Sequence, residues 1–192
     1  MAKLYFKYGA MGSSKTAQAL ITKFNYEERG MRVWLIKPKT DERDGENALS
    51  SRVGLTCECF SVGKEDSIYD LFELNHTDVS AIIADECQFF TKEQIDDMRK
   101  IVDEKGIPVL CFGLRTDFLT NLFEGSRRLF EIADSIAEIK TICACGRKAT
   151  INARIRPDGK IATEGKQVFI GGNESYLAMC HKCYKQRIES ER

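Results

Sequence analysis

The chain has 192 residues, which suits one domain with at most a small appendage. Hydrophobic residues make up 43% and charged residues 30%, an ordinary soluble balance, and no run approaches the roughly 18 apolar residues that span a bilayer. The 29 basic residues equal the 29 acidic ones, which argues against nucleic-acid binding, because such proteins usually carry a basic excess. No basic segment followed by an apolar stretch opens the chain, so we expect a cytoplasmic protein whose eight cysteines favour metal binding over disulfides.

Apolar runs and helix-like segments alternate along most of the chain. Residues 4–6 and 33–36 predict buried strands, and a helix is expected between them from about residue 16 to residue 29. A strand, a helix and a second strand in this order favour parallel pairing. The alternation continues with strands predicted at residues 79–84 and 109–112 and helices predicted at residues 67–74 and 91–102. The sequence therefore predicts an α/β fold on a parallel sheet.

The loop at residues 9–16, between the first strand and the first helix, nearly matches the phosphate-binding pattern G-x-x-x-x-G-K-[ST]. Gly9, Lys15 and Thr16 are in place, and Ser14 stands where the second glycine is expected. A helix N-terminus attracts phosphate oxygens because its N–H groups and its dipole point at them. Lys15 would reach the β- and γ-phosphates, and the Thr16 hydroxyl would bind magnesium. An ordinary strand-to-helix turn rich in small residues is the alternative.

Charged residues follow two other predicted strands. Asp85 and Glu86 come directly after the third strand, where a Walker B acid belongs: Asp85 would favour magnesium, and Glu86 would accept a proton from an attacking hydroxyl. Asp41 and Arg43 follow the second strand, where Asp41 could assist the metal and Arg43 could balance charge on the transferring phosphoryl group. The alternatives are a solvated acidic turn and a charged, flexible loop. Residues 37–54 give no periodicity, so we expect a mobile loop there.

The sequence changes character after residue 142, so we expect one domain at residues 1–141 and a second at residues 142–192. The second part begins with alternating residues at 151–155, continues through a turn signal and a strand predicted at 167–170, and closes with a helix. It also holds four cysteines at zinc half-site spacings, namely Cys143, Cys145, Cys180 and Cys183. Four thiolates would form a closed structural zinc site in a segment with little core of its own. Four unrelated buried thiols are the alternative.

For the four remaining cysteines and the two histidines we expect structural or surface positions. We expect structural roles for four thiols, Cys57, Cys59, Cys87 and Cys111, a solvated His76 and an exposed His181. Five aromatic residues follow strand ends or lie in loops: Phe89, Phe90, Phe118, Phe123 and Tyr176. Core packing and a base-sized apolar pocket both account for them.

Motifs in a fixed order extend through nearly the whole chain. They are the loop with Ala10-Met11 and Lys15-Thr16, Asp41-x-Arg43, Ser51-Arg52-x-Gly54-Leu55, Asp85-Glu86-x-Gln88-Phe89, Gly113-Leu114-Arg115-x-Asp117-Phe118, the cysteine pairs, and Gly171-Gly172-x-Glu174-x-Tyr176. In this order they resemble the type II thymidine kinases, the family of the human cytosolic enzyme and many bacterial ones. The resemblance implies a P-loop, RecA-like parallel sheet core with a small C-terminal zinc-binding lobe that carries a lasso loop.

The resemblance also implies an activity, the transfer of the γ-phosphate of ATP to the 5′-hydroxyl of thymidine to give dTMP. Glu86 would be the general base, with Lys15 and Arg43 as further catalytic residues, and magnesium would lie at Thr16, Asp41 and Asp85. The ATP phosphates would contact Gly9, Ala10, Met11, Gly12, Ser13, Ser14, Lys15, Thr16, Asp85, Glu86, Cys87 and Gln88.

The nucleoside site implied by the resemblance has side-chain walls and a main-chain lid. The walls are Met11, Leu114, Phe118 and Phe123, with Phe89 beside them and Tyr176 near the nucleoside. The lasso loop would close over the base through the main chain of Gln167, Val168, Phe169, Ile170 and Gly171. The family is commonly a homotetramer inhibited by the end-product triphosphate, dTTP. This chain departs from the pattern at Ser14 and in its Cys-x-Cys pair, which is one residue shorter than usual.

Two other functions compete with a kinase. The first is a zinc-ribbon module with an ATPase-like P-loop core that binds nucleic acid, which the neutral charge and the lack of clustered basic residues near the cysteines disfavour. The second is a non-catalytic nucleotide-binding scaffold, motivated only by Ser14. The presence of Lys15, Thr16, Asp85 and Glu86 argues for catalysis.

Overall fold

A parallel sheet forms the centre of the larger part of the protein. The computed structural model describes residues 1–40, 45, 47–168 and 175–191. Six strands pair in the order β5-β2-β6-β7-β1-β8, and every pairing is parallel. They are β1 (Leu4–Tyr8), β2 (Val33–Pro38), β5 (Phe60–Val62), β6 (Ala81–Ala84), β7 (Val109–Gly113) and β8 (Ser135–Glu138). The predicted α/β class is confirmed.

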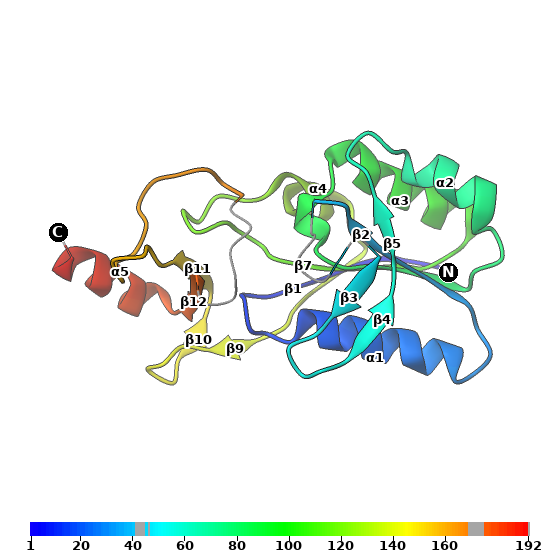
Figure 1. Cartoon of the computed structure of the whole chain (residues 1–192). Coiled ribbons are helices and arrows are strands. Elements are labelled where there is room, and N and C mark those ends of the chain that lie inside the picture. The colour runs from blue at the N-terminus through cyan, green and yellow to red at the C-terminus, as the bar shows by residue number, and fades with distance from the viewer. Residues whose placement is uncertain (41–44, 46, 169–174, 192) are drawn as a thin grey trace.

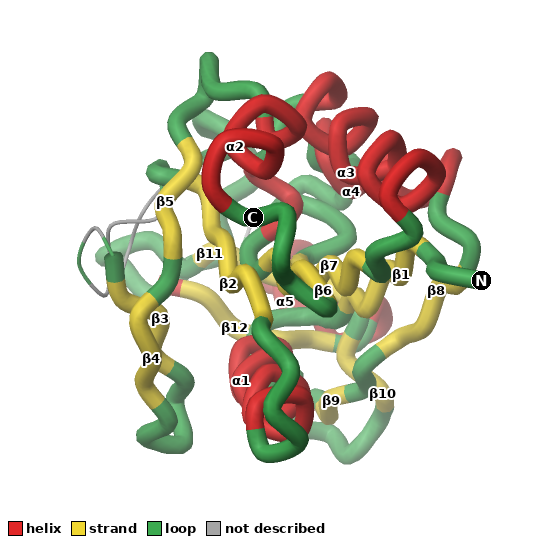
Figure 2. The backbone as a smooth tube through the Cα atoms, turned by 90° about the vertical axis from the view of Figure 1, so that its right-hand side faces the viewer, coloured by secondary structure: helices red, strands yellow, loops and turns green. Residues whose placement is uncertain are grey.

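Helices cover both faces of this sheet (Figures 1 and 2). One face carries α1 (Lys15–Glu27), and the other carries α2 (Ile68–Asn75), α3 (Lys92–Lys105) and α4 (Glu124–Ile132). Residues of β6 alternate between the two sides: Ile82 and Ala84 join the core with α2, α3 and α4, whereas Ala81 and Ile83 join the core with α1. A strand buried on both faces reads as a continuous apolar run, which is why the sequence revealed it.

The helix boundaries follow from local signals. Thr91 caps α3: its side chain accepts a hydrogen bond from the N–H of Gln94, whose side chain accepts one from the N–H of Thr91. The predicted capping box is therefore confirmed. The same helix ends at Gly106, which has a φ of 67°, a left-handed conformation that glycine adopts readily.

A smaller lobe follows the sheet. It contains the antiparallel pairs β9 (Thr141–Ile142) with β10 (Lys148–Ala149) and β11 (Ile151–Arg154) with β12 (Tyr176–Met179), followed by α5 (His181–Ser190). Its buried residues form a separate cluster of Cys143, Ala149, Ala153, Ile161, Met179 and Cys180. The expected domain boundary, between residues 141 and 142, falls inside β9. The division of the chain into two domains stays a prediction.

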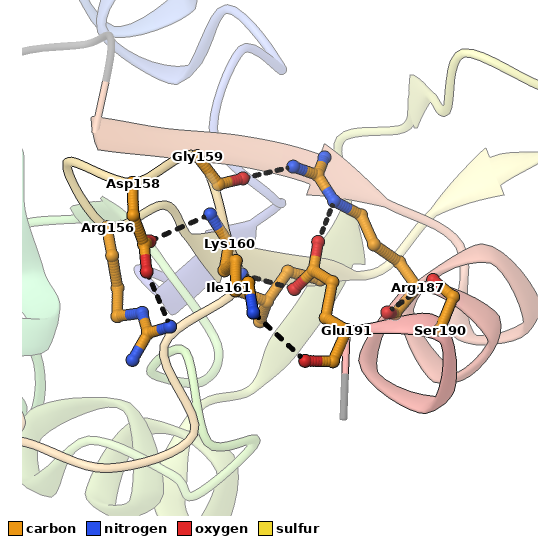
Figure 3. A network of polar contacts seen from close by, with 8 residues as sticks. All are labelled: Arg156, Asp158, Gly159, Lys160, Ile161, Arg187, Ser190 and Glu191. Atoms are coloured by element: carbon orange, nitrogen blue, oxygen red, sulfur yellow. Dashed lines mark hydrogen bonds and ion pairs between the residues drawn. The ribbon is translucent and has the colours of Figure 1, made fainter.

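Polar contacts fix the far end of α5 (Figure 3). Glu191 accepts hydrogen bonds from the N–H of Ile161 at 2.7 Å and from Arg187 Nε at 2.7 Å. Arg187 Nη2 donates in turn to the carbonyl of Gly159 at 2.5 Å. The helix that carries Cys183 is thus attached to the turn at residues 156–161 as well as to the cysteines.

Two sequence expectations are wrong in detail. Part of the segment expected to be a loop, residues 37–54, is the strand β3 (Ala48–Ser50), which pairs with β4 (Thr56–Glu58) just beyond it; both strands are too short to show periodicity. Gln167 and Val168 lie outside any strand, and the partner of β11 is β12. The other two residues of that predicted strand, Phe169 and Ile170, lie outside the described residues.

His76 is not a freely solvated side chain. Its ring stacks on Trp34 with the centroids 4.2 Å apart, and burial lowers its pKa. His181, by contrast, is exposed as predicted. Among the described residues, no helix combines the length and the apolarity needed to cross a bilayer.

Candidate active site

The phosphate-binding loop runs from the end of β1 to the start of α1. Lys15 is only 8% exposed, and its Nζ donates to the carbonyl of Ala10 at 3.0 Å, so it lies folded under the loop. Burial lowers the pKa of Lys15, while the neighbouring charges of Glu86 and Asp85 act in the opposite direction. The loop turns at Gly12 and Ser14, which have φ values of 75° and 61°.

Ser14 occupies the position where the pattern expects glycine, and its backbone explains that preference. A φ of 61° is left-handed, a region that costs a side-chain-bearing residue roughly 1–2 kcal/mol. Ser14 nevertheless keeps the loop geometry, because its carbonyl accepts the first helical bond, from the N–H of Gln18 at 3.0 Å. Serine in place of glycine therefore strains the backbone at this position but leaves the turn intact.

A buried carboxyl group faces the first turn of α1. Asp85 Oδ2 accepts a hydrogen bond from Thr16 Oγ1 at 2.7 Å, which joins the ends of β6 and the phosphate loop. Asp85 is completely buried, and its Oδ1 accepts no hydrogen bond within the described part of the chain. Burial and then the charge of Glu86 raise the pKa of Asp85 to about 7. A hydroxyl beside a buried oxygen that lacks a partner is a donor set that fits a divalent cation.

Glu86 occupies a strained turn at the end of β6. Its φ is 51°, a conformation rare for residues other than glycine and common at functional sites. Gln88, in the short helix η1 (Cys87–Phe89), donates a side-chain hydrogen bond to Glu86 and accepts one from the N–H of Leu114 at 2.9 Å. The Glu86 carboxylate is therefore oriented by a buried amide that is itself held by the chain after β7.

Two glycines let other segments approach this turn closely. A Cβ on Gly125, at the start of α4, would lie 2.4 Å from the carbonyl oxygen of Cys87. A Cβ on Gly113, at the end of β7, would lie 2.6 Å from Gln88 Oε1. Cys87 is fully buried in the core between them, and so is Cys111, as predicted. The turn at Glu86 is thus packed against backbone on two sides.

The residues predicted to line the nucleoside site come from separate segments of the chain, and we call them the aromatic wall. Phe118 and Phe123 are buried, and Phe89 lies edge-to-face on Phe123 with the ring centroids 5.6 Å apart. Met11, Leu114 and Tyr176 are half-buried. Gln167 Nε2 donates to Asp117 Oδ2 at 3.0 Å, which brings the start of the predicted lasso loop to this wall. Phe169, Ile170 and Gly171 lie outside the described residues.

Asn152 of β11 belongs to the site, although the sequence did not reveal it. Its Oδ1 accepts from the N–H of Met11 at 2.8 Å, and its Nδ2 donates to the carbonyl of Thr116 at 3.0 Å. It is only 3% exposed. A lone asparagine in an alternating strand gives no sequence signal, because both partners are more than 30 residues away.

Lys37, at the end of β2, was likewise missed. It is fully buried, and its Nζ donates to the carbonyls of Gly45 and Ala48, each at 2.8 Å. It thereby holds the chain that leads into β3. The predicted residues Asp41 and Arg43 precede this point and lie outside the described residues.

The four cysteines of the small lobe come together as predicted. Their sulfur atoms all lie within 4.8 Å of one another, a cluster compatible with zinc. The backbone N–H groups of Cys145 and Cys180 lower the pKa of Cys143, whereas hydrogen bonds with the Cys145 and Cys180 thiols raise that of Cys183. Cys57 and Cys59 lie in and beside β4, outside this cluster.

A loop of this pattern that faces a buried carboxyl group at the C-terminal edge of a parallel sheet is typical of P-loop nucleotide-binding proteins. The family model for thymidine kinase matches residues 2–184. A thymidine kinase of Yersinia pseudotuberculosis is 44% identical over 192 residues, covering 99% of this chain and 98% of that one. One of Legionella pneumophila is 46% identical over 189 residues, covering 97% and 90% of the two chains. The chain belongs to the thymidine kinase family and is therefore an ATP-dependent kinase.

Proposed function

We propose that this enzyme transfers the γ-phosphate of ATP to the 5′-hydroxyl of thymidine, giving dTMP for DNA synthesis. The observation that carries the proposal is the pairing of Thr16 with the buried Asp85, one residue before a strained Glu86. Both sides of a phosphoryl-transfer site meet there: a loop for the donor phosphates and a carboxylate for the acceptor hydroxyl. A zinc-ribbon module with an ATPase-like P-loop core would also need the loop, but the match of residues 2–184 to the thymidine kinase family does not favour that alternative.

The donor half consists of residues 9–16 and the acids at the end of β6. The N–H groups of the loop and the Lys15 ammonium bind the phosphates, and Thr16 with Asp85, assisted by Asp41, would hold magnesium. Magnesium held there would supply positive charge that offsets the charge of the phosphates. Arg43 would stabilise the transferring group. Lys15 is placed for this role, because it is buried in the loop and bonds only to loop atoms that phosphate oxygens can replace, the carbonyl of Ala10 at 3.0 Å and Ser13 Oγ at 3.5 Å.

The acceptor half consists of Glu86 and the aromatic wall. Glu86 takes the proton of the 5′-hydroxyl, and Gln88 keeps its carboxylate aimed through the hydrogen bond between their side chains. The thymine base lies against Phe118 and Phe123, with Met11, Leu114, Phe89 and Tyr176 around it. The lasso residues 167–171 would close the site through their main-chain groups.

Labelled phosphate transfer from ATP across a panel of nucleosides tests the proposed activity. Thymidine should be the preferred acceptor. Replacing Glu86 by Gln should cut turnover by about 10²–10⁴-fold and leave ATP binding nearly intact, because only proton transfer is lost. Glu93→Gln on the exposed start of α3 is the matched control and should keep full turnover. Turnover of the Glu86 variant close to that of the control would remove Glu86 from the role of base.

We also propose a structural Zn²⁺ at the four cysteines, a cytoplasmic location, a homotetramer and feedback inhibition by dTTP. An assembly is supported by Ile21 and Phe24, which are 50% and 61% exposed one turn apart on α1, where an apolar contact surface is expected. Light scattering measures the assembly: a monomeric mass would reject the tetramer. Kinetics with added dTTP measures the inhibition, and unchanged rates would reject it.

A further inference from the structure

Arg154, the last residue of β11, is a buried cation at the edge of the aromatic wall. It is only 9% exposed, and its guanidinium lies 3.8 Å from the ring centroid of Phe118 and 5.4 Å from that of Tyr176. A guanidinium over two rings gains cation–π attraction, which is stronger when water is excluded. Neither the sequence motifs nor the proposed mechanism uses this residue.

The nitrogen atoms of Arg154 contact the chain on both sides of residues 168–175. Nη1 and Nη2 donate to the carbonyls of Lys166 and Gln167, at 2.9 Å and 3.1 Å. Nε donates to the hydroxyl of Tyr176 at 3.0 Å. One side chain therefore bonds to the chain just before residue 168, at the start of the predicted lasso residues 167–171, and just after residue 175.

Neighbouring contacts bring the entry close to the wall. Gly165 has a φ of 131°, and a Cβ there would lie 3.5 Å from Arg154 Nη1 and 3.8 Å from the Phe118 ring. Two residues later, the Gln167 side chain donates to Asp117 Oδ2 at 3.0 Å. The chain at residues 165–167 thus lies against Arg154 and Phe118. A shift of this chain would move the walls of the proposed nucleoside pocket.

We propose that Arg154 is a positioning residue for the nucleoside. It does not touch the reacting atoms: it holds Phe118, Tyr176 and the entry of the lasso segment in one arrangement before thymidine binds. Holding these described groups in place in advance lowers the entropy that arranging them costs on binding. Only arginine offers three donors in one plane that can also stack on a ring, so lysine would replace it incompletely. The inference rests on the proposed nucleoside pocket.

Steady-state kinetics of Arg154→Met and Arg154→Lys tests this role. Losing charge-assisted hydrogen bonds in the methionine variant should raise the KM for thymidine by about 10- to 100-fold. The KM for ATP should change less than about twofold, since the contacts of Arg154 named above lie at Phe118, Tyr176 and residues 166–167, and kcat should fall far less than thymidine affinity. The lysine variant should recover part of the loss. A purely structural role would instead lower kcat and both affinities together.

Arg156→Met is the matched control, because it removes a guanidinium only two residues away. Arg156 is exposed and bonds to Asp158 at 2.8 Å (Figure 3), so its loss should leave both KM values unchanged. Zinc content and Tm, measured on each variant, report on folding. If the methionine variant fails to fold, Tyr176→Phe still tests the inference, because it removes only one acceptor of Arg154. It should raise the thymidine KM by a few-fold, and the rise should shrink in the Arg154→Lys background, since coupled residues are not additive.

A thymidine KM of Arg154→Met equal to that of Arg156→Met overturns the inference. So does an equal rise in the KM values of both substrates. Phe118→Leu separates this result from a failure of the pocket itself. If that variant also leaves the thymidine KM unchanged, the proposed pocket is wrong; if it raises the KM while Arg154→Met does not, only the role of Arg154 is rejected.

Discussion

Asn152 should determine how firmly the phosphate loop is held, and Asn152→Leu tests this. The leucine is close in size but leaves the Met11 N–H and the Thr116 carbonyl, which now bond to the amide at 2.8 Å and 3.0 Å, without partners. Leaving a buried polar group unpaired costs about 1–3 kcal/mol, so the pair amounts to about 2–6 kcal/mol. At about 2–4 °C per kcal/mol for a chain of this size, Tm should fall by at least about 4 °C.

The effect on nucleotide binding follows from the Met11 half alone. If about 1–3 kcal/mol falls on the loop geometry that binds phosphate, the Kd for ATP should rise by about 5- to 150-fold, measured by calorimetry.

Asn75→Leu is the matched control, since Asn75 is exposed at the end of α2. Its Tm and its Kd for ATP should stay near the wild-type values. Equal values for the Asn75 and Asn152 variants would refute the reasoning, because they would mean that the loop N–H finds an equivalent partner in water and needs no support from β11.

Two further predictions concern the loop and the metal. Ser14→Gly should relieve the strain of a φ of 61° and raise Tm by about 1–4 °C after the extra chain entropy of glycine is subtracted, with ATP bound at least as tightly. A lower Tm in calorimetric scans would mean that the serine side chain contributes more than its strain costs. Cys180→Ser, or removal of zinc by a chelator, should lower the zinc content and Tm and raise the KM for thymidine, because β11 and β12 depend on the metal. Cys57→Ser, outside the cluster, is the control; an unchanged zinc content in Cys180→Ser by elemental analysis would reject the site.

The sequence predicted what depends on neighbours along the chain. The strand β6 could be recognised because both of its faces are buried, and α3 because Thr91 and Gln94 cap it locally. The four cysteines could be paired because zinc imposes spacing on its ligands. Even the departure at Ser14 has a local explanation in its left-handed backbone.

What the sequence could not predict depends on partners far along the chain. Arg154 and Asn152 bond to backbone groups of distant segments, and any residue type offers such groups, so no pattern marks them. A strand is expected at residues 167–170, yet Gln167 and Val168 lie outside any strand, the Gln167 side chain bonds to Asp117, and β12 is the partner of β11. The hairpin of β3 and β4 escaped because three-residue strands carry no period.

The small lobe therefore contributes contacts to both proposed halves of the site. Asn152 and Arg154 stand two residues apart on β11, so their side chains leave the same face of the strand. One reaches the phosphate loop at Met11, and the other reaches the nucleoside wall at Phe118. In the proposed mechanism, the donor and acceptor halves of the site are thus connected by one short strand, and the same lobe holds the cysteine cluster and α5. It follows that a change in the metal site should disturb both substrates through β11, whereas Arg154 and Asn152 variants should separate the two effects.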